Sequence, residues 1–139
     1  MKVAETNIGT HHQLVFDVPV TNYGNGYNKH TGIFTAPQSG VYAFSFTIFP
    51  GRGSYVTMNI YRNSEVVGQV FGDMTTSHEF SSSSMVAVIS MTIGDATYLR
   101  TSSITTSAGS IYSDGNVKSS FAGWKLLIWY KIKELILSF

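Results

Sequence analysis

The sequence predicts an all-β domain, and two observations carry that prediction. Apolar and polar residues alternate with a period of two along several runs, which is typical of half-buried strands. Turn-forming residues separate these runs at intervals of roughly 8–12 residues, a spacing that favours a sandwich or barrel of short strands. We therefore expect a β-sandwich with one core.

The clearest strand covers Val41 to Phe49, where Tyr42, Phe44, Phe46 and Ile48 fall on one face. The next run, Tyr55 to Arg62, places Val56, Met58 and Ile60 on one face in the same way. Further apolar or β-branched runs predict strands over Leu14–Val20, Glu65–Phe71, Met85–Ile93, Ala96–Thr101 and Phe121–Tyr130.

The turns between these strands consist of residues whose backbone preferences favour turns. Gly and Asn tolerate a positive φ, and Pro fixes its own φ. Such residues occur at Asn25-Gly26, Pro37–Gly40, Pro50–Gly53, Gly94-Asp95 and Asp114-Gly115.

The C-terminal segment 128–139 departs from the pattern. Its residues Ile128, Ile132, Leu135, Ile136 and Phe139 have the spacing of an amphipathic helix, although Trp124, Leu126, Ile128, Tyr130 and Ile132 also satisfy a strand period. We expect a strand to about Ile128 and then a short helix packed on the domain or on a neighbouring subunit. A continued strand and a product of a shifted reading frame are the alternatives. The segment is too short and too charged to span a membrane.

Composition sets the class of protein. The 139 residues are 43% apolar, enough for one domain with a sizeable core. Charged residues make up only 12%, about half of the ~25% typical of soluble domains. A net charge of +1 disfavours nucleic-acid binding, and the absence of cysteine excludes disulfides and thiol chemistry. The weakly charged, apolar surface indicates oligomerisation.

No motif for catalysis or metal binding stands out. Serines are plentiful, but none lies in a Gly-x-Ser-x-Gly elbow, and the eight carboxylates are spread singly. The pair His11-His12 has no partner at ligand spacing, and Gly24-Asn25-Gly26 lacks the following Lys-Ser/Thr of a phosphate loop. We expect no enzyme and no cofactor, and a function in surface recognition.

A set of spaced residues resembles a known family. The first part of the set runs Phe16, Asn22, Tyr27, Phe34, Gly40, Tyr42, Phe44 and Phe46, and the downstream part contains Gly94, Asp95, Phe121 and Gly123. This spacing resembles the globular head domain of complement component 1q, a family related in fold to tumour necrosis factor. The style of Ile33–Pro37 and Phe121–Lys125 is most similar to secreted immune members from molluscs and other invertebrates.

The resemblance implies a jelly roll assembled as a homotrimer, with both termini at one end and variable loops at the other. In that frame residues 1–127 form the domain, and 128–139 are an extension atypical of the family. Family members usually open with a further strand that nothing before His11 matches, so we expect a truncated start. The motif residues have structural roles, with Gly94-Asp95 closing a hairpin and Gly123 admitting a close neighbour.

The resemblance also implies a secreted, non-enzymatic pattern-recognition module of innate immunity. Such a lectin-like trimer would bind microbial surface carbohydrate or lipopolysaccharide. The alternative is a structural or cytokine-like trimer that engages a protein receptor.

Three residues are the candidates for ligand contact. Arg52, Tyr112 and Asp114 lie on predicted loops, where recognition residues often occur, and ordinary turn roles are the alternative. Some family members hold calcium in the segment matching 72–82, where the only carboxylates are Asp73 and Glu79. Since calcium needs several oxygen ligands, we expect no tight calcium site.

Overall fold

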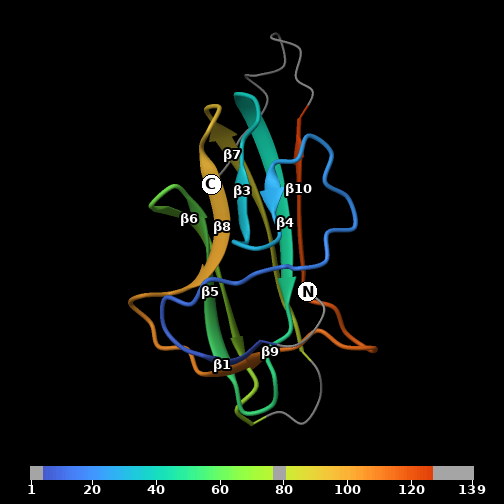
Figure 1. Cartoon of the computed structure of the whole chain (residues 1–139). Helices are drawn as coiled ribbons and strands as arrows, with labels where there is room; N and C mark the ends of the chain where they lie inside the picture. The colour runs from blue at the N-terminus through green and yellow to red at the C-terminus, as the bar shows by residue number, and fades with distance from the viewer. Residues whose placement is uncertain (1–4, 77–80, 127–139) are drawn as a thin grey trace.

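The computed structural model describes residues 5–76 and 81–126, and every regular element in them is a β-strand (Figure 1). The ten strands are β1 (Glu5–Ile8), β2 (Tyr27–Asn28), β3 (Ile33–Thr35), β4 (Gly40–Ile48), β5 (Tyr55–Arg62), β6 (Glu65–Asp73), β7 (Ser83–Met91), β8 (Ala96–Thr101), β9 (Gly109–Ile111) and β10 (Ser120–Lys125).

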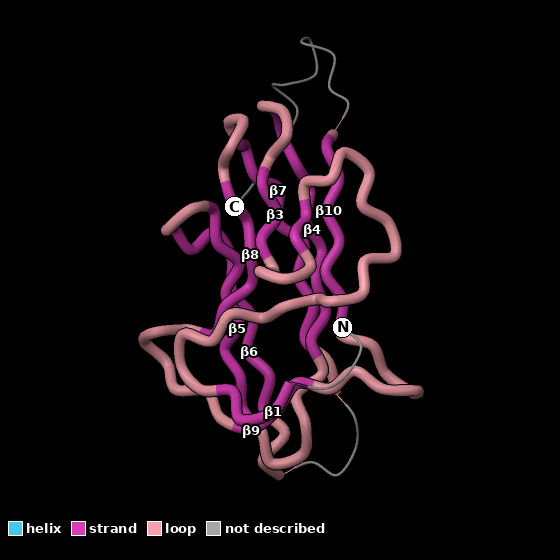
Figure 2. Tube along the Cα trace, viewed as in Figure 1, coloured by secondary structure: helices cyan, strands magenta, loops and turns pink. Residues whose placement is uncertain are grey.

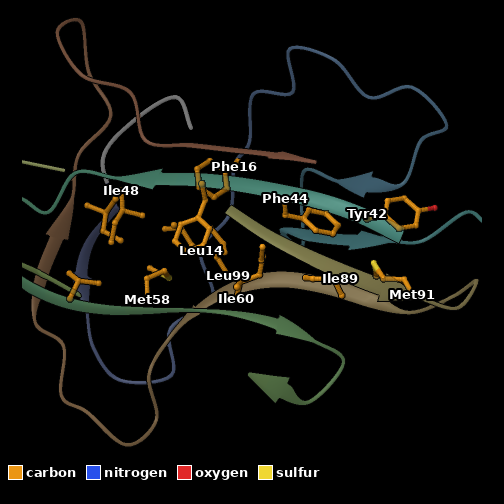
Figure 3. Packing of buried hydrophobic residues seen from close by; sticks show 14 of the residues in the cluster. Leu14, Phe16, Tyr42, Phe44, Ile48, Met58, Ile60, Ile89, Met91 and Leu99 are labelled. Carbon is orange, nitrogen blue, oxygen red and sulfur yellow. The ribbon is translucent and has the colours of Figure 1, made fainter. Parts of the chain in front are cut away.

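The strands form two main antiparallel sheets. One has the order β10-β4-β7 and the other β2-β3-β8-β5-β6, while β1 pairs with β9 at one end (Figure 2). Apolar side chains of β4 and β7 meet those of β5 and β8 in the space between the sheets (Figure 3). The all-β sandwich predicted from the alternating pattern is thus confirmed.

The strand β4 forms the centre of the first sheet because its alternation matches the sandwich. It pairs along its whole length with β7, from Gly40 opposite Met91 to Ile48 opposite Ser83. Phe44, Phe46 and Ile48 are almost completely buried. Large aromatic side chains contribute much of the apolar area that such a core removes from water.

Aromatic rings connect β4 to its neighbours. The Phe44 ring stacks on Phe121 of β10 at 5.7 Å between centroids and meets Phe34 of β3 edge-on at 5.3 Å. A Cβ added to Gly123 would lie 2.5 Å from the Phe44 ring, so the expectation that this glycine admits a close neighbour is confirmed.

The predicted strand over Leu14–Val20 is wrong. The segment is irregular, and its alternation in burial ends after Phe16: Leu14 and Phe16 enter the core, whereas Val18 and Val20 are exposed. Pro19 supplies no backbone donor for a ladder, and the backbone is held by other contacts, including Leu14 N–H donating to Leu99 O at 3.0 Å.

The expected hairpin at Gly94-Asp95 is also wrong. The strands on either side, β7 and β8, belong to different sheets, so the turn carries the chain across the sandwich. Asp95 N–H donates to Thr92 O at 2.9 Å, and Gly94 has a φ of +91°. The motif residues are therefore turn formers, as expected, in a connection between sheets.

Glu5 and Leu126, the ends of the described part of the chain, lie at opposite ends of the sandwich. The termini themselves lie outside the described residues, so the expectation that both share one end stays a prediction. Glu5 of β1 pairs with Ile111, which also bridges to Pro50 just beyond β4. At the other end, Leu126 N–H donates to Val41 O near the start of β4. The pairing of β1 with β9 places Glu5 at the same end of the sandwich as the turn that follows β4.

The C-terminal predictions can be compared with the structure only as far as Leu126. Of the strand expected over Phe121–Tyr130, residues 121–125 are present in β10, which ends at Lys125. Residues 127–130 and the helix expected within 128–139 lie outside the described residues. Within 5–76 and 81–126, no helix has the length and hydropathy of a membrane span.

Candidate ligand-binding surface

Several of the motif residues anchor the loop before β2. The Tyr27 hydroxyl accepts from Phe16 N–H and donates to Phe16 O, both at 2.9 Å. The Asn22 side-chain amide donates to Tyr27 O at 2.8 Å, and its oxygen accepts from Tyr27 N–H at 3.1 Å. These residues satisfy backbone groups, so their spacing reflects loop architecture.

The candidate Arg52 lies in the turn between β4 and β5. The turn is closed by Ser54 N–H donating to Gly51 O at 3.0 Å, and Gly53 has a φ of +74°. Gly53 N–H also donates to Met74 O at 2.9 Å, which connects the turn to the segment after β6. Arg52 itself is exposed at the tip of this braced turn.

The candidate Tyr112 lies directly beside this turn. Gly51 N–H donates to Ser110 O at 2.9 Å, and Tyr112 N–H donates to Phe49 O at 2.7 Å. A Cβ added to Gly51 would lie 3.3 Å from the Tyr112 ring. The ring is thus packed against the Arg52 turn, and Ser119 Oγ donates to Tyr112 O at 2.6 Å from the other side.

The candidate Asp114 shapes its own loop. Its Oδ1 accepts from Asn116 N–H at 2.7 Å and Val117 N–H at 3.0 Å, and Ser113 bridges to Lys118. The Asn116 and Val117 hydrogen bonds hold the pKa of Asp114 below its ordinary value. The carboxylate is therefore an anion fixed two residues from Tyr112.

The structure thus gathers all three candidate residues at one end of the sandwich. The exposed Arg52 guanidinium and the Tyr112 ring come from segments whose backbones hydrogen-bond to each other, and the Asp114 carboxylate follows two residues after Tyr112. Such a set suits polar, hydroxyl-rich or anionic groups, which take hydrogen bonds from side chains and stack on rings.

The same end contains the region named for calcium. Oδ1 of Asp73 accepts from Thr75 N–H at 2.9 Å and from Thr75 Oγ1 at 2.6 Å, which holds the pKa of Asp73 below its ordinary value. Glu79 lies outside the described residues. Among the residues the structure describes, no three His, Cys, Asp or Glu side chains gather as metal ligands. The absence of a tight calcium site stays a prediction.

Comparison with known proteins decides the family. A family model described as "C1q domain" matches residues 2–126. The chain belongs to the C1q domain family. Modules of this family and of the related tumour-necrosis-factor fold bind without catalysing reactions, and this C1q domain is no enzyme.

Curated relatives agree with that assignment. Caprin-2 of Danio rerio is 32% identical over 115 residues, which are 81% of this chain and 12% of that protein. Complement C1q tumor necrosis factor-related protein 3 of Mus musculus is 31% identical over 114 residues, or 81% of this chain and 44% of that protein. The C1q domain therefore spans less than half the length of these relatives.

Solved structures show the same fold. The globular domain of zebrafish complement 1qA protein superposes with a TM-score of 0.59 at 14% identity, covering 89% of this chain and 95% of that one. Eiger, a tumour necrosis factor from S. frugiperda, gives a TM-score of 0.57 at 16% identity, covering 89% and 90%. These likenesses establish the jelly-roll architecture of the C1q domain.

Two histidines, His11 and His12, occupy structural positions that the sequence did not predict. His12 Nε2 lies 2.5 Å from Glu5 Oε2, and Glu5 Oε1 accepts from Val15 N–H at 3.0 Å. His11 Nε2 lies 3.1 Å from the Arg100 guanidinium. His11-His12 therefore fastens the N-terminal segment to the sandwich.

Two features escaped the sequence analysis. One is a stack in which the Arg100 guanidinium lies 4.8 Å from the centre of the Tyr98 ring, itself stacked on Tyr61 at 5.0 Å. The period-two pattern contained its signal, since Tyr61 and Tyr98 are partners on β5 and β8. The other is an apolar groove beside β10, which needs the fold to become visible.

Proposed function

We propose that this C1q domain is a secreted pattern-recognition module of innate immunity, a lectin-like trimer that binds microbial surface carbohydrate or lipopolysaccharide through its loop end. The observation that carries the proposal is the packing of the Arg52 turn against Tyr112, with Asp114 held in its own loop two residues after Tyr112. Recognition residues on loops braced by a rigid sandwich are already oriented for a ligand, which lowers the entropic cost of binding.

The chemistry of these three side chains supports a sugar or anionic ligand. An aromatic ring offers a flat apolar face to a sugar, and a carboxylate accepts hydrogen bonds from its hydroxyl groups. The Arg52 guanidinium suits the phosphate or carboxylate groups of bacterial surface polymers, because its planar fork pairs with such anions. Each site alone would bind weakly, so useful affinity requires several copies.

The sheet β10-β4-β7 supplies a face suited to bringing copies together. Its outward residues include Ala43, Ser45 and Thr47 of β4, Val86 and Val88 of β7, and Ala122 and Trp124 of β10, none of which is charged. Val86 is 61% exposed and Trp124 is 49% exposed. An uncharged, partly apolar sheet face is a natural subunit interface.

Binding to washed bacteria and to a glycan array tests the proposal. Arg52→Ala and Tyr112→Ala should each reduce binding about tenfold or more, the loss expected for a contact residue in a multivalent binder. Tyr23→Ala and Lys29→Ala are matched controls, because both side chains are exposed, Tyr23 on the loop before β2 and Lys29 on the loop after it. The controls should bind as the parent does.

Two results would contradict the proposal. Unchanged binding by both Arg52→Ala and Tyr112→Ala would remove the loop end from ligand recognition. Binding to neither bacteria nor glycans, together with capture of a cell-surface protein receptor, would favour the cytokine-like alternative.

A further inference from the structure

An apolar groove of about 990 Å³ runs beside β10. Its floor includes Phe16, Phe44 and Phe121, and one wall is β10 itself. The other wall is the loop before β2, which arches beside β10 in Figure 1 and contributes Val18 and Val20. The groove is thus an opening into the sandwich core along one edge of the first sheet.

The edge of β10 that faces the groove lacks a strand partner among the described residues, where β10 pairs with β4 alone. Leu126 N–H donates to Val41 O, and in an antiparallel ladder alternate residues point their backbone groups to the same side. The backbone N–H groups of Ala122 and Trp124 therefore face β4, whereas those of Phe121, Gly123 and Lys125 face the groove.

The rim of the groove exposes more apolar surface than water favours. Val20 is 94% exposed and Tyr23 98%, while Val18 and Trp124 are each 49% exposed. A free strand edge beside an apolar groove is a site that another segment of polypeptide can cover.

We propose that residues 128–139 of the same chain occupy this groove and cover the free edge of β10. The first reason is position: the segment follows β10 after only two residues, so it is tethered to the strand that forms the groove wall. Tethering makes docking intramolecular, and a short linker gives an effective concentration on the order of millimolar.

The second reason is length. Thirteen residues follow Leu126, which at roughly 3.3 Å per extended residue reach about 40 Å. The six residues of β10 span about half of that distance at the same rise. The segment can therefore turn and return along the entire groove wall.

The third reason is chemistry. The segment carries seven strongly apolar residues, Ile128, Trp129, Ile132, Leu135, Ile136, Leu137 and Phe139. Covering the exposed rim with them removes apolar area from water on both partners. Docking also covers the edge amides of β10, so that strands of other chains cannot pair with them.

Cross-linking in the full chain tests this directly, because the chain contains no cysteine. Val20→Cys combined with Leu135→Cys should give an efficient link with a short bismaleimide. His30→Cys combined with Leu135→Cys is the control, since His30 is exposed and absent from the groove lining. Equal linking of both pairs would overturn the proposal.

Mixing isotope-labelled and unlabelled chains assigns each link to one chain or to two. Links within a chain support the proposal. A majority of links between labelled and unlabelled peptides would show that a second copy fills the groove, which overturns docking in the same chain.

Hydrogen exchange provides an independent readout. Removal of residues 128–139 should accelerate exchange at Phe121, Gly123 and Lys125 about tenfold or more, and leave Ala122 and Trp124, which pair with β4, unchanged. Leu135→Asp in the full chain should produce the same pattern if the shortened chain folds poorly, with Ser138→Asp as the charge-matched control. Unchanged exchange at the three edge amides in Leu135→Asp would overturn the proposal.

Discussion

The Tyr27 hydroxyl forms two hydrogen bonds with the backbone of Phe16, one through the N–H and one through the carbonyl, each 2.9 Å long. Phe16 is buried and its ring lies 5.9 Å from that of Phe121. One side chain thus satisfies both backbone groups of an irregular segment that has no ladder of its own. This contact holds the inner part of the loop before β2 against the core.

Tyr27→Phe should therefore destabilise the domain while preserving its shape. Both backbone groups of Phe16 lose their partner, and leaving such groups unsatisfied costs about 1–3 kcal/mol in the free energy of unfolding. Urea unfolding followed by fluorescence measures the difference. Tyr23→Phe, at a side chain that is 98% exposed, should leave the midpoint unchanged.

The same tyrosine makes stability depend on alkaline pH. Burial, the largest cause, raises the pKa of Tyr27 above its ordinary value of 10.0, whereas the Phe16 hydrogen bond opposes that rise. The unfolded state then loses its proton at lower pH than the folded state does. This contribution to stability is complete below about pH 10 and is lost as the pH rises through the raised pKa.

The melting temperature measured from about pH 8 to pH 11 checks this sign. The alkaline decline should be shallower in Tyr27→Phe than in the parent. An identical decline in the two proteins would assign it to other groups.

Much of the fold followed from the period-two pattern, and the exceptions have physical causes. The alternation in β4, β5 and β8 reports burial against one core, so their positions were predictable. In Leu14–Val20 the same alternation marks an irregular segment, because a side chain can enter the core without a backbone partner strand. Gly94-Asp95 has the residues of a hairpin turn, but residue type alone does not state whether the flanking strands share a sheet.

The candidate site shows the same division. Arg52, Tyr112 and Asp114 were identified as loop residues, and the proximity of the Arg52 turn to Tyr112 depends on the bridge between Pro50 and Ile111, which lie 61 positions apart. No local pattern encodes such a bridge. The groove beside β10 was likewise hidden, since it depends on which strands are neighbours.

Gly123→Ala should destabilise the domain through a steric clash. The new methyl group would lie 2.5 Å and 2.6 Å from two carbons of the Phe44 ring, which is itself buried and stacked on Phe121. Rearrangement in such a packed core costs about 1–3 kcal/mol. Gly115→Ala is the control, because a Cβ there meets no atom within 4 Å. Equal denaturation midpoints for the two variants would show that the Phe44 ring moves aside freely.

The uncharged face of β10-β4-β7 leads to a prediction about assembly. The parent should scatter light as a particle of about three times its 15.2 kDa chain mass, because this face holds exposed Val86 and Trp124 with no charge to repel a second copy. Val86→Glu would bury a carboxylate in the interface without a partner, which costs more than a typical contact supplies. We expect this variant to be a folded 15.2 kDa monomer by light scattering and circular dichroism.

Phe71→Glu is the matched control, since Phe71 is 57% exposed on β6 of the other sheet, and this variant should keep the parent's mass. A trimeric Val86→Glu protein would place the interface elsewhere, and a monomeric parent across all concentrations would mean that this face has a different partner.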